Sequence, residues 1–160
     1  MRRLLLTSLA LSATLLATQA IAQAPPPYGE TINLEQAKKA AAASQAEASK
    51  NGWAMAITVV GPTGDLVYFQ KMDNTQYASV TIAQHKARAA ATFRRPTKAF
   101  EERVSAGGAG VAALTLDGVI ASDGGIPIVV GGKTIGAMGC SGGTGAQDGQ
   151  TCQAGVDALK

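Results

Sequence analysis

His85 is the residue with the clearest capacity for chemistry, and it is the only histidine in the chain. A neutral imidazole nitrogen can bind a metal ion or a haem iron near neutral pH. A lone histidine at the border between the polar and apolar faces of a helix is more often a solvated or capping side chain. The residues alone leave both interpretations open, and the sequence holds no histidine and cysteine cluster of the kind that binds zinc.

Lys86 follows directly and falls on an apolar face. When residues 78–93 are turned as a helix, at about 100° per residue, Lys86 lies within an apolar arc. The apolar members of that arc are Ile82, Ala83, Ala87, Ala89, Ala90 and Phe93. An unpaired ammonium is costly to bury, so Lys86 must pair with a carboxylate or a helix C-terminus, extend to the surface, or face a ligand. We expect it to be mostly buried, with its ammonium hydrogen-bonded.

Arg94 and Arg95 stand at the end of the same helix, which Pro96 terminates. Cations at this position are stabilised by the negative end of the helix dipole, which is the simpler interpretation. The alternative is that they bind the carboxylates of a ligand, for which the guanidinium fork is well suited.

The N-terminus is typical of a cleavable secretory signal peptide. Met1-Arg2-Arg3 supplies positive charge, and the apolar residues 4–16 are too few to span a bilayer of about 30 Å as a helix. Ala20-Ile21-Ala22 gives the small-x-small cleavage pattern. We therefore expect a signal peptide over 1–22, a Pro-rich segment over 23–30 and a single domain over 31–160. The protein would be periplasmic or secreted, without stable membrane insertion.

Cys140 and Cys152 are the only cysteines, and both lie in the exported part. An oxidising compartment would let them form an intrachain disulfide, and two free thiols are the alternative. Closing a loop of about a dozen residues contributes about 3 kcal/mol in the chain-entropy account. A pairing requires the two Cα atoms to lie within about 7 Å.

The charge balance does not favour a nucleic-acid partner. The chain has 14 Lys and Arg against 11 Asp and Glu, and cleavage of the signal peptide removes Arg2 and Arg3 but no acidic residue. The remaining excess is about one positive charge, and no basic stripe survives.

Hydrophobic patterning predicts the elements that must position these residues. Asn33 and Gln36 have the capping-box spacing ahead of a helix that runs to Lys50. Hairpin strands are expected over 53–60 and 66–71, and again over 126–130 and 133–138. Further helices are expected over 78–93, 97–104 and about 147–159. This order predicts an α+β fold with a central antiparallel sheet and helices packed on it. The strand over 53–60 is apolar on both faces, so we expect it to be covered on both.

Two longer motifs resemble one known family. Residues 82–97 read IAQHKARAAATFRRPT and residues 124–142 read GGIPIVVGGKTIGAMGCSG. Gln147-Asp148 and Ala154-Gly155 follow, and the first hairpin ends in Met72-Asp73. Together these are similar to the GlcG/HbpS-like haem-degrading-domain family, over nearly the whole mature chain. Cys140 departs from the common pattern, which has an aliphatic residue at that position.

The resemblance implies an α/β sandwich of the profilin-like kind and a tendency to form homo-oligomers. It also implies non-covalent binding of haem b, for haem handling or redox sensing, although many members have no established activity. We expect His85 to be the axial iron ligand, with Tyr68, Met72 or a cysteine as alternatives. Lys86 and Arg94 or Arg95 would lie near the propionates, and Tyr68 or Met72 would line the site.

Two other functions compete with haem binding. The protein could be an oligomeric scaffold, or bind another small flat ligand, with Lys86 as a structural ion-pair partner. An enzymatic function has the least support, because the chain offers one histidine, no activated nucleophile and no evident carboxylate pair.

Overall fold

The computed structural model describes residues 24–160, so the predicted signal peptide lies outside the described residues. Four α-helices, one 3₁₀ helix and four strands follow one another in this range. In chain order they are α1 (Leu34–Lys50), β1 (Ala56–Val60), β2 (Leu66–Lys71), α2 (Ala78–Phe93), α3 (Lys98–Ser105), η1 (Gly108–Thr115), β3 (Gly125–Val130), β4 (Lys133–Ser141) and α4 (Gly145–Asp157). Within residues 24–160 no helix is long and apolar enough to cross a membrane.

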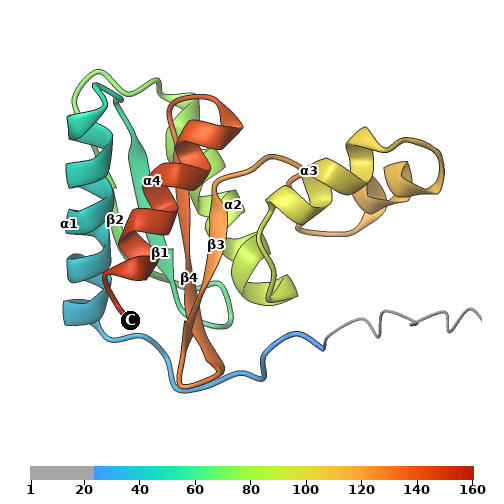
Figure 1. The fold of residues 1–160 in the computed structure, drawn as a ribbon, viewed down its shortest axis with the longest axis horizontal. Coiled ribbons are helices and arrows are strands. Elements are labelled where there is room, and N and C mark those ends of the chain that lie inside the picture. Colours follow the sequence, from blue (N-terminus) through green and yellow to red (C-terminus); the bar gives the residue numbers. More distant parts are fainter. Residues whose placement is uncertain (1–23) are drawn as a thin grey trace, which may run out of the picture.

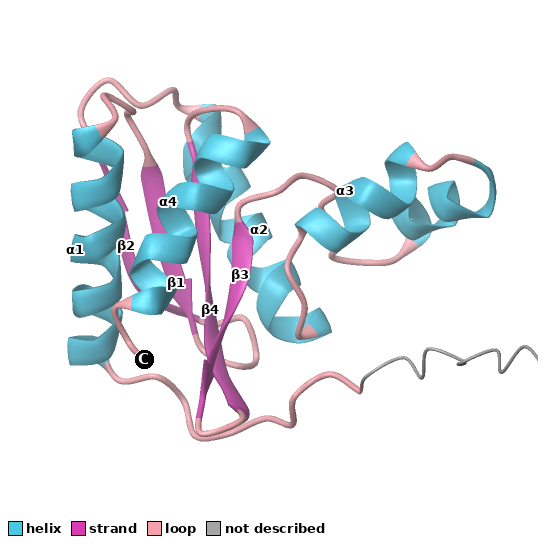
Figure 2. Ribbon diagram, viewed as in Figure 1, coloured by secondary structure: helices cyan, strands magenta, loops and turns pink. Residues whose placement is uncertain are grey.

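The four strands form one antiparallel sheet in the order β2-β1-β4-β3. Each hairpin supplies one edge strand and one central strand, and the central strands β1 and β4 pair with each other from Ala56↔Ser141 to Val60↔Ala137. All five residues of β1 are buried, which confirms that this strand is covered on both faces. Figure 2 shows the sheet between its helices.

Helices cover both faces of the sheet, as the predicted α+β sandwich requires. Helices α1 and α4 lie against each other on one face, and α2 packs across β1, β4 and β3 on the other (Figure 1). The larger core lies beneath α1 and α4 and is built from apolar side chains of those helices, the sheet and the residues just before them, among them Ile32, Ala40, Met55, Ile57, Val59, Ile128, Met138 and Val156. A smaller cluster lies beneath α2.

Helix α2 approaches β4 closely because Gly139 has no side chain. A Cβ atom at Gly139 would collide with the carbonyl oxygen of Ala83 and would lie 2.5 Å from the amide nitrogen of Ala87. The backbone of α2 therefore rests directly on the sheet, which positions every other side chain of this helix.

An arm made of α3 and η1 projects away from the sandwich (Figure 1). Only Phe100 of α3 and Ala113 of η1 are buried. The arm exposes large apolar side chains, namely Val111, Leu114 and Leu116 just beyond η1. Hydrophobic patterning predicted no element between residues 104 and 126, where η1 lies.

Most predicted element bounds agree with the structure. The capping box of α1 is confirmed, since Asn33 Oδ1 accepts from the Gln36 amide at 2.9 Å and Gln36 Oε1 accepts from the Asn33 amide at 3.1 Å. Strand β2 and helix α2 have the predicted bounds. The predicted start of the first strand at Trp53 is wrong, because the strand pairings of β1 begin at Ala56.

Candidate functional site

His85 is exposed on α2 and lines an open hollow of about 370 Å³. The other residues of this hollow are Arg88, Asp117, Gly118 and Val119. Arg88 lies one turn after His85, and its aliphatic part rests on Gly64, where a Cβ would be 2.8 Å from Arg88 Cγ. The hollow thus combines an accessible imidazole, a guanidinium, a carboxylate and one apolar side chain.

Lys86 points into the protein instead. It is 1% exposed, its Nζ lies 2.7 Å from Asp148 Oδ2, and it donates to the main-chain oxygen of Asp123 at 2.5 Å. The prediction that Lys86 is buried and hydrogen-bonded is confirmed. Because its ammonium already has two protein acceptors, the interpretation of Lys86 as a propionate contact does not fit this geometry, and the ion-pair interpretation does.

Asp148 is the partner that the sequence reasoning did not identify. Its second oxygen, Oδ1, accepts from the Gly143 amide at 3.0 Å. Burial raises the pKa of this carboxyl above its ordinary value, and hydrogen bonds from Lys86, Gly143 and Gly142 oppose that rise. A sequence signal existed in the Gln147-Asp148 motif, but it carried no information about which cation the carboxylate meets.

Arg94 holds the N-terminal segment. It ends α2 in a left-handed conformation, with φ of 51°, and its guanidinium donates to the Pro26 carbonyl at 3.0 Å. The same group lies 4.8 Å from the centre of the Tyr28 ring. Tyr28 in turn donates from its hydroxyl to the Thr92 carbonyl at 2.9 Å. Arg94 therefore binds the segment that precedes α1 to the end of α2.

Arg95 is exposed, and its guanidinium lies 5.9 Å from the centre of the Phe100 ring. With Arg94 it lines a hollow of about 610 Å³, whose other residues are Ala24, Pro25, Pro26, Pro96 and Ala99. Arg94 is nine positions after His85 in the chain, which corresponds to about 14 Å along a helix. The imidazole and the two arginines therefore line different hollows.

Tyr68 and Met72 lie away from α2. Both pack against the larger core, on the face of the sheet that α1 and α4 cover. The Tyr68 hydroxyl donates to Gln70 Oε1 at 3.2 Å. The structure therefore does not bring these two side chains together with His85.

The disulfide between Cys140 and Cys152 is present, with the Cα atoms 5.6 Å apart, and this prediction is confirmed. It joins the end of β4 to α4 one turn after Asp148. Within residues 24–160 no three or more His, Cys, Asp or Glu side chains gather into a group that could hold a metal ion.

The sequence matches the model of a family described as haem-degrading protein HbpS-like over residues 32–157. The protein GlcG of Escherichia coli strain K12 is 41% identical over 110 residues, which cover 69% of this chain and 81% of GlcG. An uncharacterized 15.0 kDa protein from the dhaT-dhaS intergenic region of Citrobacter freundii is 33% identical over 131 residues, or 81% of this chain and 92% of that protein.

Three solved structures share the fold. The Klebsiella pneumoniae protein ORFY has a TM-score of 0.77 at 27% identity, with 92% of this chain and 97% of that chain covered. A double mutant of Streptomyces reticuli HbpS has a TM-score of 0.75 at 25% identity, with coverages of 94% and 99%. The structure of a PduOC:heme complex has a TM-score of 0.74 at 22% identity, with coverages of 81% and 96%. These likenesses confirm the predicted architecture of an antiparallel sheet covered by helices.

Proposed function

Because the chain belongs to the haem-degrading HbpS-like family, we propose that it is an exported protein that binds haem b non-covalently, for haem handling or redox sensing. The family description supports a haem-related function, and one protein of the same fold was solved as a heme complex. Export is supported by the N-terminal sequence pattern and by the disulfide, which suits an oxidising compartment.

The accessible imidazole of His85 in the hollow on α2 is the observation that carries the choice of site. His85 would supply an axial nitrogen to the iron, and Arg88, one turn further along the helix, would bind a propionate. Val119 offers an apolar contact for the ring. Asp117 would repel a nearby propionate, which favours placing the carboxylates on the Arg88 side.

Titration of hemin into the purified protein tests this proposal. We expect a saturable Soret shift, a changed Soret maximum in His85→Ala, and weaker binding with an unchanged maximum in Arg88→Ala. Thr81→Ala is the matched control, because Thr81 is exposed one turn before His85 on α2. If His85→Ala keeps both the maximum and the affinity, His85 is not the ligand. If neither the wild type nor any variant binds hemin, the protein is better described as a scaffold.

The scaffold function requires a homo-oligomer, which we also propose. The exposed apolar side chains Val111, Leu114 and Leu116 at the end of the arm support it, because apolar side chains gathered on a projecting element are typical of an interface. Light scattering after size exclusion should show an oligomer that Leu114→Glu dissociates. Lys39→Glu, on the exposed side of α1, is the control and should leave the mass unchanged. A monomeric wild-type protein would contradict the proposal.

A further inference from the structure

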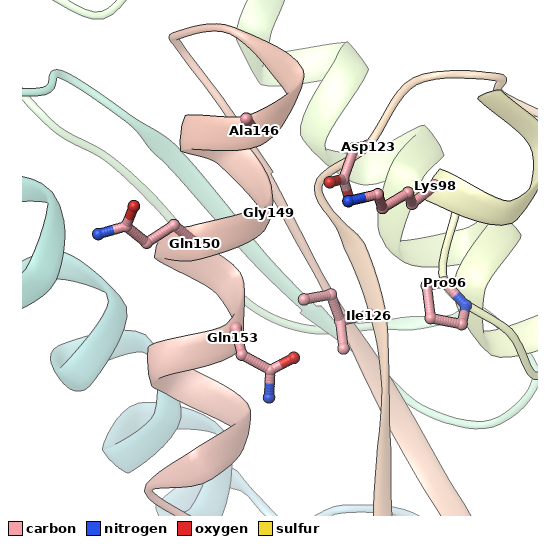
Figure 3. Close-up of a pocket in the computed structure, with 8 residues that line it drawn as sticks. All are labelled: Pro96, Lys98, Asp123, Ile126, Ala146, Gly149, Gln150 and Gln153. Atoms are coloured by element: carbon pink, nitrogen blue, oxygen red, sulfur yellow. The ribbon is translucent and has the colours of Figure 1, made fainter. Parts of the chain in front are cut away.

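A third hollow, of about 350 Å³, lies between α4 and the segments that flank the arm, and the haem proposal makes no use of it (Figure 3). Ala146, Gly149, Gln150 and Gln153 line it from α4. Pro96, Lys98, Asp123 and Ile126 line it from the opposite side. Its volume is at the lower end of the range for ligand pockets, about 300 Å³ and above, so it suits a small molecule.

Asp123 is held rigidly at this hollow. Its amide donates to Glu101 Oε2 at 2.6 Å, and its carbonyl accepts from Lys86 Nζ at 2.5 Å. A buried ion pair such as Lys86–Asp148 is weak evidence for a gain in stability, because apolar residues of similar volume often stabilise a fold as much or more. Here the buried lysine fixes the main chain of Asp123, so Lys86 is a positioning residue for that carboxylate.

Within residues 24–160, only one oxygen of the Asp123 carboxylate accepts a hydrogen bond. Oδ1 accepts from the Gly124 amide at 2.6 Å, while Oδ2 lies over Gly149, where a Cβ atom would be only 2.7 Å away. The glycine thus makes the room that this oxygen occupies. Gln153 adds a second acceptor, because its Nε2 donates to Asp157 at 2.8 Å and its Oε1 faces the hollow (Figure 3).

Lys98 brings a positive charge to the same wall. Its side chain is exposed and extends toward Asp123 in Figure 3, but the two do not form an ion pair with each other in the described structure. Ile126 and Pro96 provide apolar surface next to these charges. The hollow therefore offers an anion, a cation and an apolar floor within the reach of one small molecule.

We propose that this hollow binds a free α-amino acid with a branched apolar side chain. Its ammonium would donate to Asp123 Oδ2, and its carboxylate would pair with Lys98. Its side chain would pack on Ile126 and Pro96. Both charges of the zwitterion and its apolar group are then matched by residues of the hollow.

Titrations followed by amide NMR, with three probes of one carbon skeleton, test the proposal. Leucine carries both charges, isoamylamine lacks the carboxylate and 4-methylpentanoate lacks the ammonium. We expect leucine to shift the amides of Gly149 and Ile126 saturably, with each analogue binding about tenfold more weakly or worse, since a lost charge-assisted hydrogen bond corresponds to about that factor. Equal binding of all three probes, or no saturable shift with leucine, would overturn the proposal.

Variants separate the roles of the two charges. Asp123→Asn should weaken leucine and isoamylamine binding but not that of 4-methylpentanoate, and Lys98→Met should weaken leucine and 4-methylpentanoate but not isoamylamine. Gly149→Ala should weaken leucine and isoamylamine binding by crowding the Asp123 carboxylate while keeping every charge. Thr81→Ala is the control, because Thr81 is exposed on α2 and does not line this hollow. Unchanged leucine binding in Asp123→Asn would refute the site, and hemin binding should be unaffected in every variant.

Discussion

Lys86 of α2 and Asp148 of α4 form an ion pair of 2.7 Å, with 2% and 3% of their side chains exposed. The two helices lie on opposite faces of the sheet, so this contact links the two helical layers. We expect Lys86→Met to lower the free energy of unfolding by about 3–5 kcal/mol, because it leaves a buried carboxylate without its cation. Urea denaturation measures the change.

Replacing both partners separates the energy of the ion pair from the contribution that each side chain makes alone. We expect Lys86→Met/Asp148→Asn to be less destabilised than the sum of the two single variants, since no uncompensated charge stays buried. Additive losses would show that the two side chains stabilise the fold through separate contacts.

The free energy of unfolding should depend on pH through the titration of Asp148. Burial raises its pKa, so the folded protein keeps this proton at a pH where the unfolded chain has released it. The contribution of Asp148 to the free energy of unfolding therefore falls as pH rises from about 4, the unfolded value, through the raised pKa. We expect the stability difference between wild type and Asp148→Asn to decrease over that range. An increase would mean that Lys86 and Gly143 outweigh the burial.

The disulfide should stabilise the protein by restricting the unfolded chain. Cys140 and Cys152 are separated by 12 residues in sequence, and for such a loop the expected contribution is about 3 kcal/mol. Guanidinium denaturation of Cys140→Ala/Cys152→Ala measures it. Reducing agent should destabilise the wild type and leave the double variant unchanged, which controls for the effect of the substitutions themselves.

Gly139 should tolerate no side chain. A methyl group there meets the backbone of α2 at Ala83 and Ala87, so Gly139→Ala must push the helix off the sheet. We expect a loss above about 3 kcal/mol, the upper part of the range for overpacking, seen as a lower midpoint of thermal unfolding. Gly52→Ala offers open space around the new methyl group, although its φ of 71° disfavours alanine, and should cost about 1 kcal/mol. A larger loss at Gly52 than at Gly139 would contradict the close-packing argument.

Local sequence signals predicted the ends of helices correctly where a capping residue or a proline marks the boundary. Asn33 and Gln36 fixed the start of α1, and Pro96 placed the end of α2 closely. Boundaries set by strand pairing were missed. Strand β4 extends beyond the predicted Met138 to Ser141, because Ser141 pairs with Ala56 of a strand distant in sequence. No local pattern contains that information.

The candidate site was predictable only one residue at a time. Helical rotation correctly placed Lys86 in the interior, but its two acceptors come from segments far along the chain. The sequence predicted that Arg94 either interacts with the helix dipole or binds a ligand carboxylate. Its observed contact with Pro26 depends on how the N-terminal segment returns to the end of α2. Asp123 was not considered, because its position depends on Lys86 and Glu101 and not on a motif of its own.

The central pairing of β1 with β4 also determines when the chain can fold. The middle of the sheet cannot form until β4 is available, and α2, which packs mainly on β4, lacks its main support before then. A protein dominated by such distant pairings has a high contact order and folds slowly. On the export route proposed above, this late folding would keep the chain in a state that a translocation channel can thread. It would also leave Cys140 and Cys152 accessible to a disulfide-forming catalyst before they are enclosed.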